Sequence, residues 1–268
     1  MENSCFFIVI VTLSLLLKCT TLCSGRNFFN SSTDQDALLA FKATISRDSY
    51  AILANNWSTN SASVCYWIGV SCGIKHQRVT ALNLSGFHLR GTVAPHLGSL
   101  TFLRSLDISF NNFTGILPDE LSNLRRLKEI NVGFNSFTGE VPFWFGTLPE
   151  LQHIHLNNNT FTGKIPPSLF NTTSKLQTLN LQYNQFTAGS MPYGGIPTQL
   201  GNLTSLKYLW LGANKLTGGI PKQLGNLTSL NSIYLGVNNL TGGIPKQFGN
   251  LTSLNSLSLH NNKLTNLI

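Results

Sequence analysis

Two consecutive stretches of the chain are almost identical: Leu206–Ser229 reads LKYLWLGANKLTGGIPKQLGNLTS and Leu230–Ser253 reads LNSIYLGVNNLTGGIPKQFGNLTS. Both follow the 24-residue template L-x-x-L-x-L-x-x-N-x-L-T-G-x-I-P-x-x-L/F-G-x-L-x-x. Further copies fill Leu103–Arg126, Leu127–Glu150, Leu151–Lys175 and Leu176–Ser205, a degenerate first copy starts at Val79, and an unfinished one starts at Leu254. Because one copy cannot bury its own leucines, the copies must stack into a solenoid.

Each copy begins with a short strand. The apolar residues at positions 1, 4 and 6, such as Leu103, Leu106 and Ile108, point inward, and the polar residues between them point outward. Stacked copies therefore predict a curved parallel sheet on one side. The Gly219–Pro221 type of segment then bends the chain, and its proline leaves room for only a 3₁₀ turn or extended chain on the convex side.

An asparagine at position 9 is the next fixed feature of the template. Its amide carries two donors and an acceptor, so it can satisfy backbone groups that the turn would bury. We interpret this column as structural: Asn111, Asn135, Asn159, Asn184, Asn214, Asn238 and Asn262. Phe87 takes this position in the first copy, so the column is expected to start one copy later.

The L-T/S-G-x-I-P segment resembles the plant-specific leucine-rich repeat, and the resemblance runs from about residue 33 to residue 268. That repeat builds the ectodomains of plant receptor-like kinases and receptor-like proteins, and inhibitors of wall-degrading enzymes. The resemblance implies an α/β leucine-rich-repeat solenoid. It would have a curved parallel β-sheet on its concave side, a 3₁₀ or extended convex side, and an N-terminal helical cap closed by a disulfide.

The N-terminus predicts export. Residues 5–17 form an apolar run that is too short to span a bilayer, as in a secretory signal, although no Lys or Arg precedes it. An uncleaved anchor and a buried core segment are the alternatives. We expect a signal peptide over 1–25, a cap domain over 26–78, and about eight repeats over 79–268.

The predicted cap combines a helix and a cysteine pair. Residues 33–45 predict a helix with Thr33 as N-cap and with Leu38, Phe41 and Ile45 on one face. Cys65 and Cys72, with six residues between them in an exported chain, predict a disulfide rather than a metal site, because no suitably spaced histidines accompany them. The helix with C-x-W-x-G-V-x-C resembles the cap of plant leucine-rich-repeat ectodomains.

Finer resemblance lies in residues 72–108. The C-G-x-x-x-x-R-V-x-A-L-x-L entry is similar to the receptor kinase subfamily that includes plant sensors of bacterial patterns. Relative to that family, the sequence is expected to be a truncated member that stops before the transmembrane and kinase parts. The long fifth copy, with its insertion at 187–195, is interpreted as a tolerated loop, with a ligand-contacting loop or an exon-joining error as alternatives.

No catalytic motif supports an enzyme. The sequence has no phosphate-binding G-x-x-x-x-G-K-[ST], no H-E-x-x-H and no G-x-S-x-G, and we expect no cofactor and no metal. His153 and His155 share one strand face, but a third ligand is not evident, so exposed polar positions are the plainer interpretation.

The concave sheet is the predicted binding surface, because solenoids use this face for partners and exposed aromatic residues anchor interfaces. The alternative is a row of ordinary exposed strand residues in which β-propensity alone explains the aromatics. The candidate residues are Asp107, Phe110, Asn131, Phe134, His153, His155, Asn180, Tyr183, Tyr208, Trp210 and Tyr234.

Charge and sequons describe the surface further. From Leu151 onward the chain has seven lysines and no Asp or Glu, which favours an acidic ligand, although lysines on a solvated surface explain this equally well. The export signal disfavours nucleic acid. We expect glycosylation at the N-x-[ST] sequons Asn30, Asn56, Asn112, Asn158, Asn171, Asn202, Asn226, Asn239 and Asn250.

The sequence therefore supports a receptor ectodomain that binds a peptide or protein ligand, with a co-receptor kinase as partner and immune or developmental signalling as the role that the resemblance implies. Such a receptor would lie at the plasma membrane, facing outward. The alternative is a secreted binder in the apoplast, such as an inhibitor of wall-degrading enzymes, or a decoy or pseudogene product. An enzyme is the least favoured class.

Overall fold

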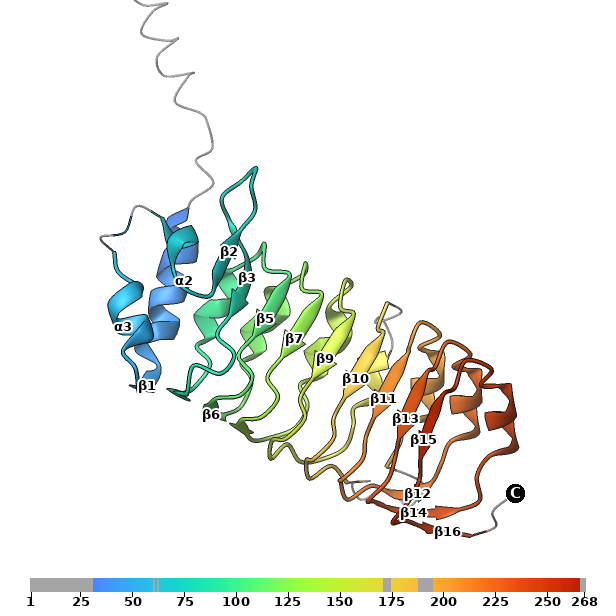
Figure 1. The fold of residues 1–268 in the computed structure, drawn as a ribbon. Coiled ribbons are helices and arrows are strands. Elements are labelled where there is room, and N and C mark those ends of the chain that lie inside the picture. The colour runs from blue at the N-terminus through green and yellow to red at the C-terminus, as the bar shows by residue number, and fades with distance from the viewer. Residues whose placement is uncertain (1–30, 60, 62, 171–174, 188–194, 266–268) are drawn as a thin grey trace, which may run out of the picture.

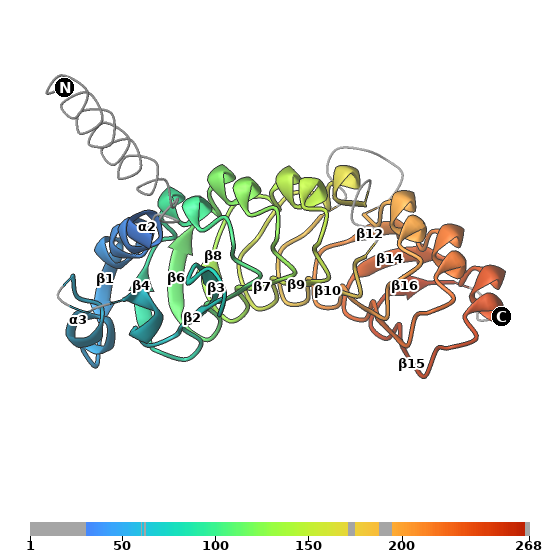
Figure 2. The ribbon, with the colours of Figure 1, turned by 90° about the horizontal axis from the view of Figure 1, so that it is seen from above.

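A computed structural model describes residues 31–59, 61, 63–170, 175–187 and 195–265. These residues form a curved stack of coils with strands on one side and 3₁₀ turns on the other (Figures 1 and 2). The predicted signal peptide at 1–25 and residues 188–194 of the insertion lie outside the described residues. We number the coils 1 to 8, and they start at Val79, Leu103, Leu127, Leu151, Leu176, Leu206, Leu230 and Leu254.

The main sheet has nine strands among the described residues and confirms the predicted parallel stacking. From β3 onward successive strands pair parallel and in register, so that Leu106 lies opposite Ile130 and Ile130 opposite Ile154, whereas β2 of the cap pairs antiparallel with β3. In chain order the strands are β2 (Val70–Cys72), β3 (Val79–Asn83), β5 (Ser105–Asp107), β7 (Glu129–Asn131), β9 (His153–His155), β10 (Thr178–Asn180), β11 (Tyr208–Trp210), β13 (Ser232–Tyr234) and β15 (Ser256–Ser258).

The convex side consists of short 3₁₀ helices, which confirms the prediction drawn from the proline. In five of these helices the proline is the residue directly before the first turn, as Pro118 and Pro221 show. The helices are η2 (Pro95–Ser99), η3 (Asp119–Asn123), η4 (Phe143–Thr147), η5 (Pro167–Phe170), η6 (Thr198–Asn202), η7 (Lys222–Asn226) and η8 (Lys246–Asn250).

The sequence analysis did not anticipate two small sheets beside the main one. They form where the extended L-T-G segments of neighbouring coils come together, because one coil's backbone can pair with the next at this point as well. One contains β1 (Ile45–Asp48), β4 (Leu89–Gly91), β6 (Asn112–Gly115) and β8 (Ser136–Phe137), and the other contains β12 (Thr217–Gly219), β14 (Asn239–Gly242) and β16 (Lys263–Leu264).

The asparagine column has the structural role that we predicted. Asn159 donates through Nδ2 to the carbonyl oxygens of Val132, 3.0 Å, and Leu156, 3.1 Å, and its Oδ1 accepts from the Phe137 amide at 2.9 Å. The same bonds recur from Asn111 to Asn238, so each amide ties one coil to the previous one. This ladder closes the buried turn that follows every strand.

The turn that the ladder closes has an unusual backbone. The residue at position 8, just before each ladder asparagine, has a positive φ in every described coil, for example 53° at Phe110, 53° at Asn158 and 57° at Val237. This left-handed conformation suits glycine and asparagine but strains bulky or β-branched residues. The hydrogen bonds of the ladder hold it in place even where the residue is valine.

Aromatic rings form a column inside the first part of the solenoid. Phe113, Phe137, Phe161 and Phe186 occupy position 11 of coils 2 to 5, are fully buried, and stack with ring centroids 6.2 to 6.5 Å apart. Phe41 of the cap helix stacks on Phe113 at 5.8 Å and joins the column to the cap. Leu216 and Leu240 take the same position in coils 6 and 7.

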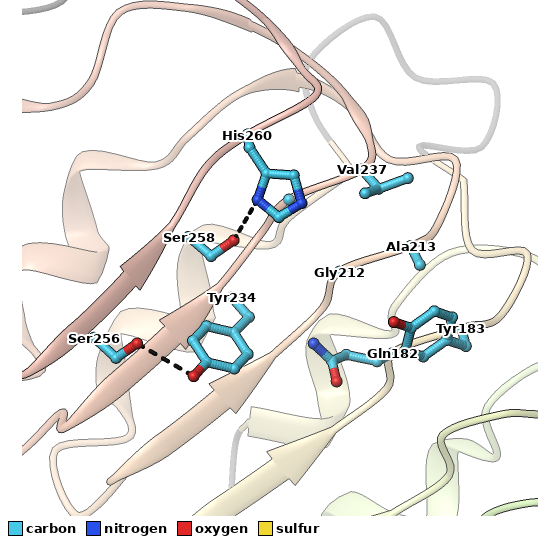
Figure 3. Close-up of a pocket in the computed structure, with 10 residues that line it drawn as sticks. Gln182, Tyr183, Gly212, Ala213, Tyr234, Val237, Ser256, Ser258 and His260 are labelled. Carbon is cyan, nitrogen blue, oxygen red and sulfur yellow. Dashed lines mark hydrogen bonds between the residues drawn. The ribbon is translucent and has the colours of Figure 1, made fainter.

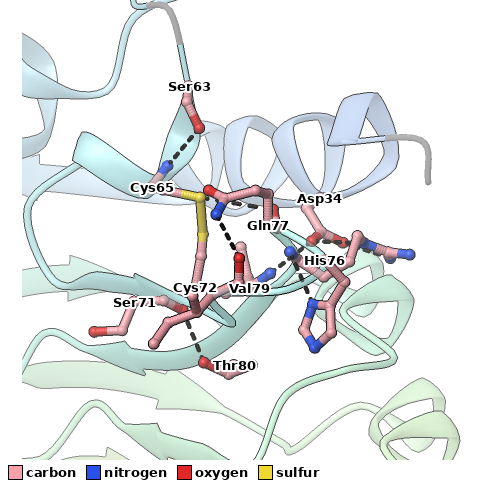
Figure 4. The surroundings of a disulfide bond; sticks show 11 residues. Asp34, Ser63, Cys65, Ser71, Cys72, His76, Gln77, Val79 and Thr80 are labelled. Carbon is pink, nitrogen blue, oxygen red and sulfur yellow. Dashed lines mark hydrogen bonds and ion pairs between the residues drawn. A yellow bond between two sulfur atoms is a disulfide. The ribbon is translucent and has the colours of Figure 1, made fainter. Parts of the chain in front are cut away.

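The cap confirms the predicted disulfide and corrects the predicted helix. Cys65 is bonded to Cys72, the last residue of β2 at the edge of the main sheet (Figure 4). Helix α2 is described from Ser31 to Ala43, so Thr33 lies inside the helix and is not its N-cap. Ile45 is not on the helix face either, because the chain leaves the helix and enters β1, where it pairs with Gly91.

A buried ion pair joins the cap to the first coil. Both oxygens of Asp34 accept from the Arg78 guanidinium, at 2.9 and 2.7 Å, and the Val79 amide donates to the same carboxylate at 2.8 Å. The two remaining cap elements are α3 (Ile52–Asn56) and the 3₁₀ turn η1 (Val64–Tyr66). Bidentate pairing satisfies both charges where water is excluded.

Candidate functional site: the concave face

The candidate binding residues come from β5 to β13 and from the turns that follow these strands. Ten of them are exposed or half-buried along the concave side, as strand alternation predicts. Asn180 differs, because it is only 7% exposed. Its Nδ2 donates to Asn157 Oδ1 at 3.1 Å, and its Oδ1 accepts from the backbone N–H of Gln182. We therefore place Asn180 with the scaffold and not with the available surface.

In coils 2 to 4 the polar side chains of the concave face bind one another. Asp107 accepts from Ser109, 2.7 Å, and from Asn131, 3.2 Å. His153 Nδ1 lies 3.1 Å from the Thr178 hydroxyl. Burial lowers the pKa of His155 from its ordinary value, and His153 acts in the same direction, while Glu129 and Asp107 oppose the shift. This part of the face is polar and already largely hydrogen-bonded.

The metal interpretation of the two histidines gains no support. Within the described part of the chain no group of three or more His, Cys, Asp and Glu side chains is placed to hold a metal ion.

Two phenylalanines stand out on this first half of the face. Phe110 and Phe134, at position 8 of coils 2 and 3, stack on each other with their centroids 4.2 Å apart and both remain exposed. Because the two rings stack, each shields part of the other's apolar surface from solvent.

In coils 6 and 7 the face changes to an aromatic row. The Tyr208 and Trp210 rings lie 5.6 Å apart, and Trp210 stacks with Tyr234 at 6.0 Å. Trp210 Nε1 donates to Ser232 Oγ at 3.0 Å, and Ser256 Oγ donates to Tyr234 Oη at 3.2 Å. The hydrogen bonds from Ser256 and Ser232 lower the pKa of Tyr234. We call Tyr208, Trp210 and Tyr234 the aromatic row.

Beside this row the surface is hollowed by about 430 Å³ (Figure 3). Sequence reasoning named two residues that line the hollow, Tyr183 and Tyr234, but missed Gln182, Gly212, Gly236 and His260. The signal was present in the template: position 7 is glycine in coils 6 and 7 but carries a side chain in coils 4, 5 and 8. The sequence analysis counts position 7 with the concave surface, but its candidate residues come from positions 3, 5 and 8 of the template.

The predicted glycosylation sites differ in accessibility. Asn202, Asn226 and Asn250 lie at the same place, the last residue of three successive 3₁₀ helices, and all three are exposed. Asn56 and Asn112 are exposed and Asn158 and Asn239 are half-buried, whereas Asn30 and Asn171 lie outside the described residues.

The sequence matches family descriptions along most of the described chain. Residues 31–73 match the leucine rich repeat N-terminal domain, and residues 101–161, 125–186, 175–203, 205–227 and 229–251 match leucine rich repeats. The chain belongs to the leucine-rich-repeat proteins and has the architecture of a plant ectodomain with an N-terminal cap.

Individual relatives agree with this assignment. The chain is 40% identical over 108 residues to the LRR receptor-like serine/threonine-protein kinase EFR of Arabidopsis thaliana. The aligned region covers 40% of this chain and 10% of EFR. It thus spans about a tenth of the length of this curated relative. Within the part that the structure describes, none of the helices is both long and apolar enough to cross a membrane.

Two solved structures have the same fold. The PEPR1 structure with AtPEP1 superposes with a TM-score of 0.79 at 33% identity, over 86% of this chain and 32% of PEPR1. The Arabidopsis receptor kinase HAESA, in complex with the peptide hormone IDA and the co-receptor SERK1, superposes with a TM-score of 0.66 at 32% identity, over 86% of this chain and 42% of HAESA.

Proposed function

We propose that this chain is the ligand-binding ectodomain region of a plant receptor-like kinase and that it binds a peptide on its concave face. The aromatic row is the observation that carries the proposal. Tyr208, Trp210 and Tyr234 fill no core, since the leucine and isoleucine residues at positions 1, 4 and 6 of their coils are already fully buried. Large aromatic side chains on an exposed face are the residues most enriched among interface anchors.

The similar structures support the same class of ligand. PEPR1 was solved with AtPEP1, and HAESA with a peptide hormone and a co-receptor. By analogy we propose a peptide ligand and a co-receptor kinase for this chain, with the ectodomain facing outward at the plasma membrane in immune or developmental signalling.

The aromatic row can be tested without a known ligand. The full chain, secreted from plant cells so that Cys65–Cys72 forms, is used to select from a library of random linear peptides displayed on their own mRNA. Affinities of the enriched peptides are then measured by calorimetry. Replacing Tyr208, Trp210 and Tyr234 together by alanine should weaken binding at least about thirtyfold, since a single anchor can contribute 2 kcal/mol or more.

The matched control is the Phe143→Ala variant, which removes an exposed aromatic ring from η4 on the convex side. It should bind the enriched peptides within about twofold of the wild-type chain. Unchanged affinity in the triple variant would refute the choice of surface.

A further inference from the structure

The hollow beside the aromatic row is built from four successive coils, 5 to 8. Tyr234 and Ser256 come from β13 and β15, and Gly212, Val237 and His260 come from the turns after the strands (Figure 3). Gln182 and Tyr183 close it on the side of coil 5. The hollow is thus part of the same concave face that we propose as the ligand surface.

Missing side chains create the hollow. At position 7, coils 4, 5 and 8 carry Asn157, Gln182 and His260, whereas coils 6 and 7 carry Gly212 and Gly236. A Cβ on Gly236 would lie 2.7 Å from the His260 ring and 2.9 Å from Ser258 Oγ, which are the outer ends of two side chains. Neither glycine has a positive φ, so the backbone does not require glycine at these two positions. Their consequence is the open space.

The walls of the hollow present hydrogen-bond donors. Because Ser256 donates to Tyr234 Oη, the phenol keeps its own proton for another acceptor. Ser258 Oγ lies 2.8 Å from His260 Nδ1, and with the serine donating, the ring proton is on Nε2. The side-chain amide of Gln182 supplies a further N–H donor. Within the described residues, neither Gln182 Nε2 nor His260 Nε2 has a hydrogen-bond partner.

The charge of the surroundings selects among acceptors. None of the ten residues around the hollow is acidic, and residues 151–268 contain seven lysines and neither Asp nor Glu. On the same face of coils 2 and 3, by contrast, Asp107 and Glu129 supply carboxylates. A cluster of donors in a positive field stabilises a negatively charged acceptor.

We propose that this hollow is the subsite for a carboxylate of the peptide ligand, held by Tyr234, His260 and Gln182. The inference rests on the proposed function, and it adds which chemical group of the peptide is recognised and where. The carboxylate comes either from an Asp or Glu side chain or from the peptide C-terminus.

Two substitutions test the subsite in the secreted full chain. Gln182→Glu keeps the shape and places a negative charge in the hollow. Gly236→Asn fills it with the side chain that coil 4 already carries at the same position, Asn157. Gly133→Asn is the matched control, because Gly133 has position 7 in coil 3, outside the hollow, and the atoms nearest to its added Cβ belong to the Asn131 and Asn157 side chains.

The peptides enriched by the wild-type chain are synthesised in three forms: unchanged, with Asp and Glu replaced by Asn and Gln, and with an amidated C-terminus. One of the two neutralised forms should bind the wild-type chain about tenfold more weakly, since a hydrogen bond to a charged group contributes more than a neutral one. Which form loses affinity identifies the source of the carboxylate. For the Gln182→Glu variant, the same neutralisation of the peptide should change the affinity by less than about twofold.

The unchanged peptide should bind the Gly236→Asn variant about tenfold more weakly than the wild-type chain. Its affinity for the control variant Gly133→Asn should stay at the wild-type value.

The outcomes distinguish a failure of the carboxylate subsite from a failure of the proposed peptide-binding function. Enriched peptides whose affinity is the same in all three forms, or is unaffected by Gly236→Asn, would overturn the carboxylate subsite while the peptide-binding function stands. Selection that enriches no peptide at all would overturn the proposed function, and the subsite with it.

Discussion

Coils 2 to 5 and coils 6 and 7 share one backbone but differ at two positions of the template, position 11 in the interior and position 5 on the concave face. In coils 2 to 5, position 11 is a buried phenylalanine, while position 5 on the concave face is polar: Asp107, Asn131, His155 and Asn180. In coils 6 and 7, position 11 is leucine, and position 5 is Trp210 or Tyr234.

This difference shows which residues fix the scaffold and which can vary. The solenoid accepts either phenylalanine or leucine inside, provided that apolar volume fills the layer between coils. The outward positions are free of that constraint, so an aromatic residue there calls for another explanation. In this chain we assign that explanation to ligand binding.

The asparagine ladder is the feature that both regions have in common, and its removal should have the largest effect. Asn159→Ala and Asn238→Ala each leave buried carbonyl and amide groups of the turn unpaired. Each change should lower the free energy of unfolding by at least about 3 kcal/mol. Urea denaturation measures this, and exposed Asn123→Ala, the control, should stay within about 0.5 kcal/mol of the wild-type chain. A large difference between the two variants in the loss of unfolding free energy would contradict a common role of the ladder in both regions.

Exchanging the aromatic residues sharpens the contrast between inside and outside. Phe161→Leu removes ring contacts with Phe137 and Phe186 in the buried column and should cost about 1–2 kcal/mol of stability. Trp210→Leu, on the concave face of coil 6, loses a hydrogen bond to Ser232 and should cost less stability than Phe161→Leu, about 1 kcal/mol or below. Thermal and urea unfolding of the two variants decide the matter: a larger cost for Trp210→Leu would mean that the aromatic row is packing after all.

The strained turn gives a smaller effect of opposite sign. Val237 is β-branched and has a φ of 57°, whereas Asn158 and Asn261 occupy the same coil position with similar φ. Asparagine tolerates this conformation, so Val237→Asn should stabilise the chain by about 1 kcal/mol. An unchanged or lower urea midpoint would show that Val237 makes packing contacts that outweigh the strain.

His155 should give the smallest effect, confined to the polar region of the face. Because burial lowers its folded-state pKa, the folded chain resists the proton that the unfolded chain accepts. The stability from neutral His155 is therefore present above the ordinary histidine range and declines as pH falls from that range to the lower folded-state pKa. The wild-type chain should lose more stability than His155→Gln between neutral and mildly acidic pH. Parallel pH profiles of the two chains would contradict the buried position.

The fold was predictable because the template repeats its constraints. Inward leucines, the ladder asparagine and the proline before the convex turn each occur in several copies, so the strand, the turn and the 3₁₀ side could be read from any of them. The cap was less accessible, since it occurs once. The sequence around Thr33 resembled a helix start, but the helix already includes Ser31. Ile45 fitted the helical spacing, but it lies in β1 and pairs with Gly91.

The site was predictable only as a surface. Alternation placed Tyr208, Trp210 and Tyr234 outward, but it could not show that Asn180 would be covered by its neighbours, because that depends on side-chain contacts between coils. Nor could a template of single residues show the hollow, which arises from what Gly212 and Gly236 lack together with what Gln182 and His260 supply.

The most direct test of the aromatic row as the ligand surface is to locate a bound peptide. An enriched peptide carrying a photoreactive phenylalanine analogue is cross-linked to the secreted full chain, and the attachment sites are identified by mass spectrometry. We predict cross-links within residues 206–240, which include the row, or at the other residues that line the hollow, Gln182, Tyr183, Ser256, Ser258 and His260. Cross-links confined to residues 79–160 or to the 3₁₀ helices of the convex side would contradict it.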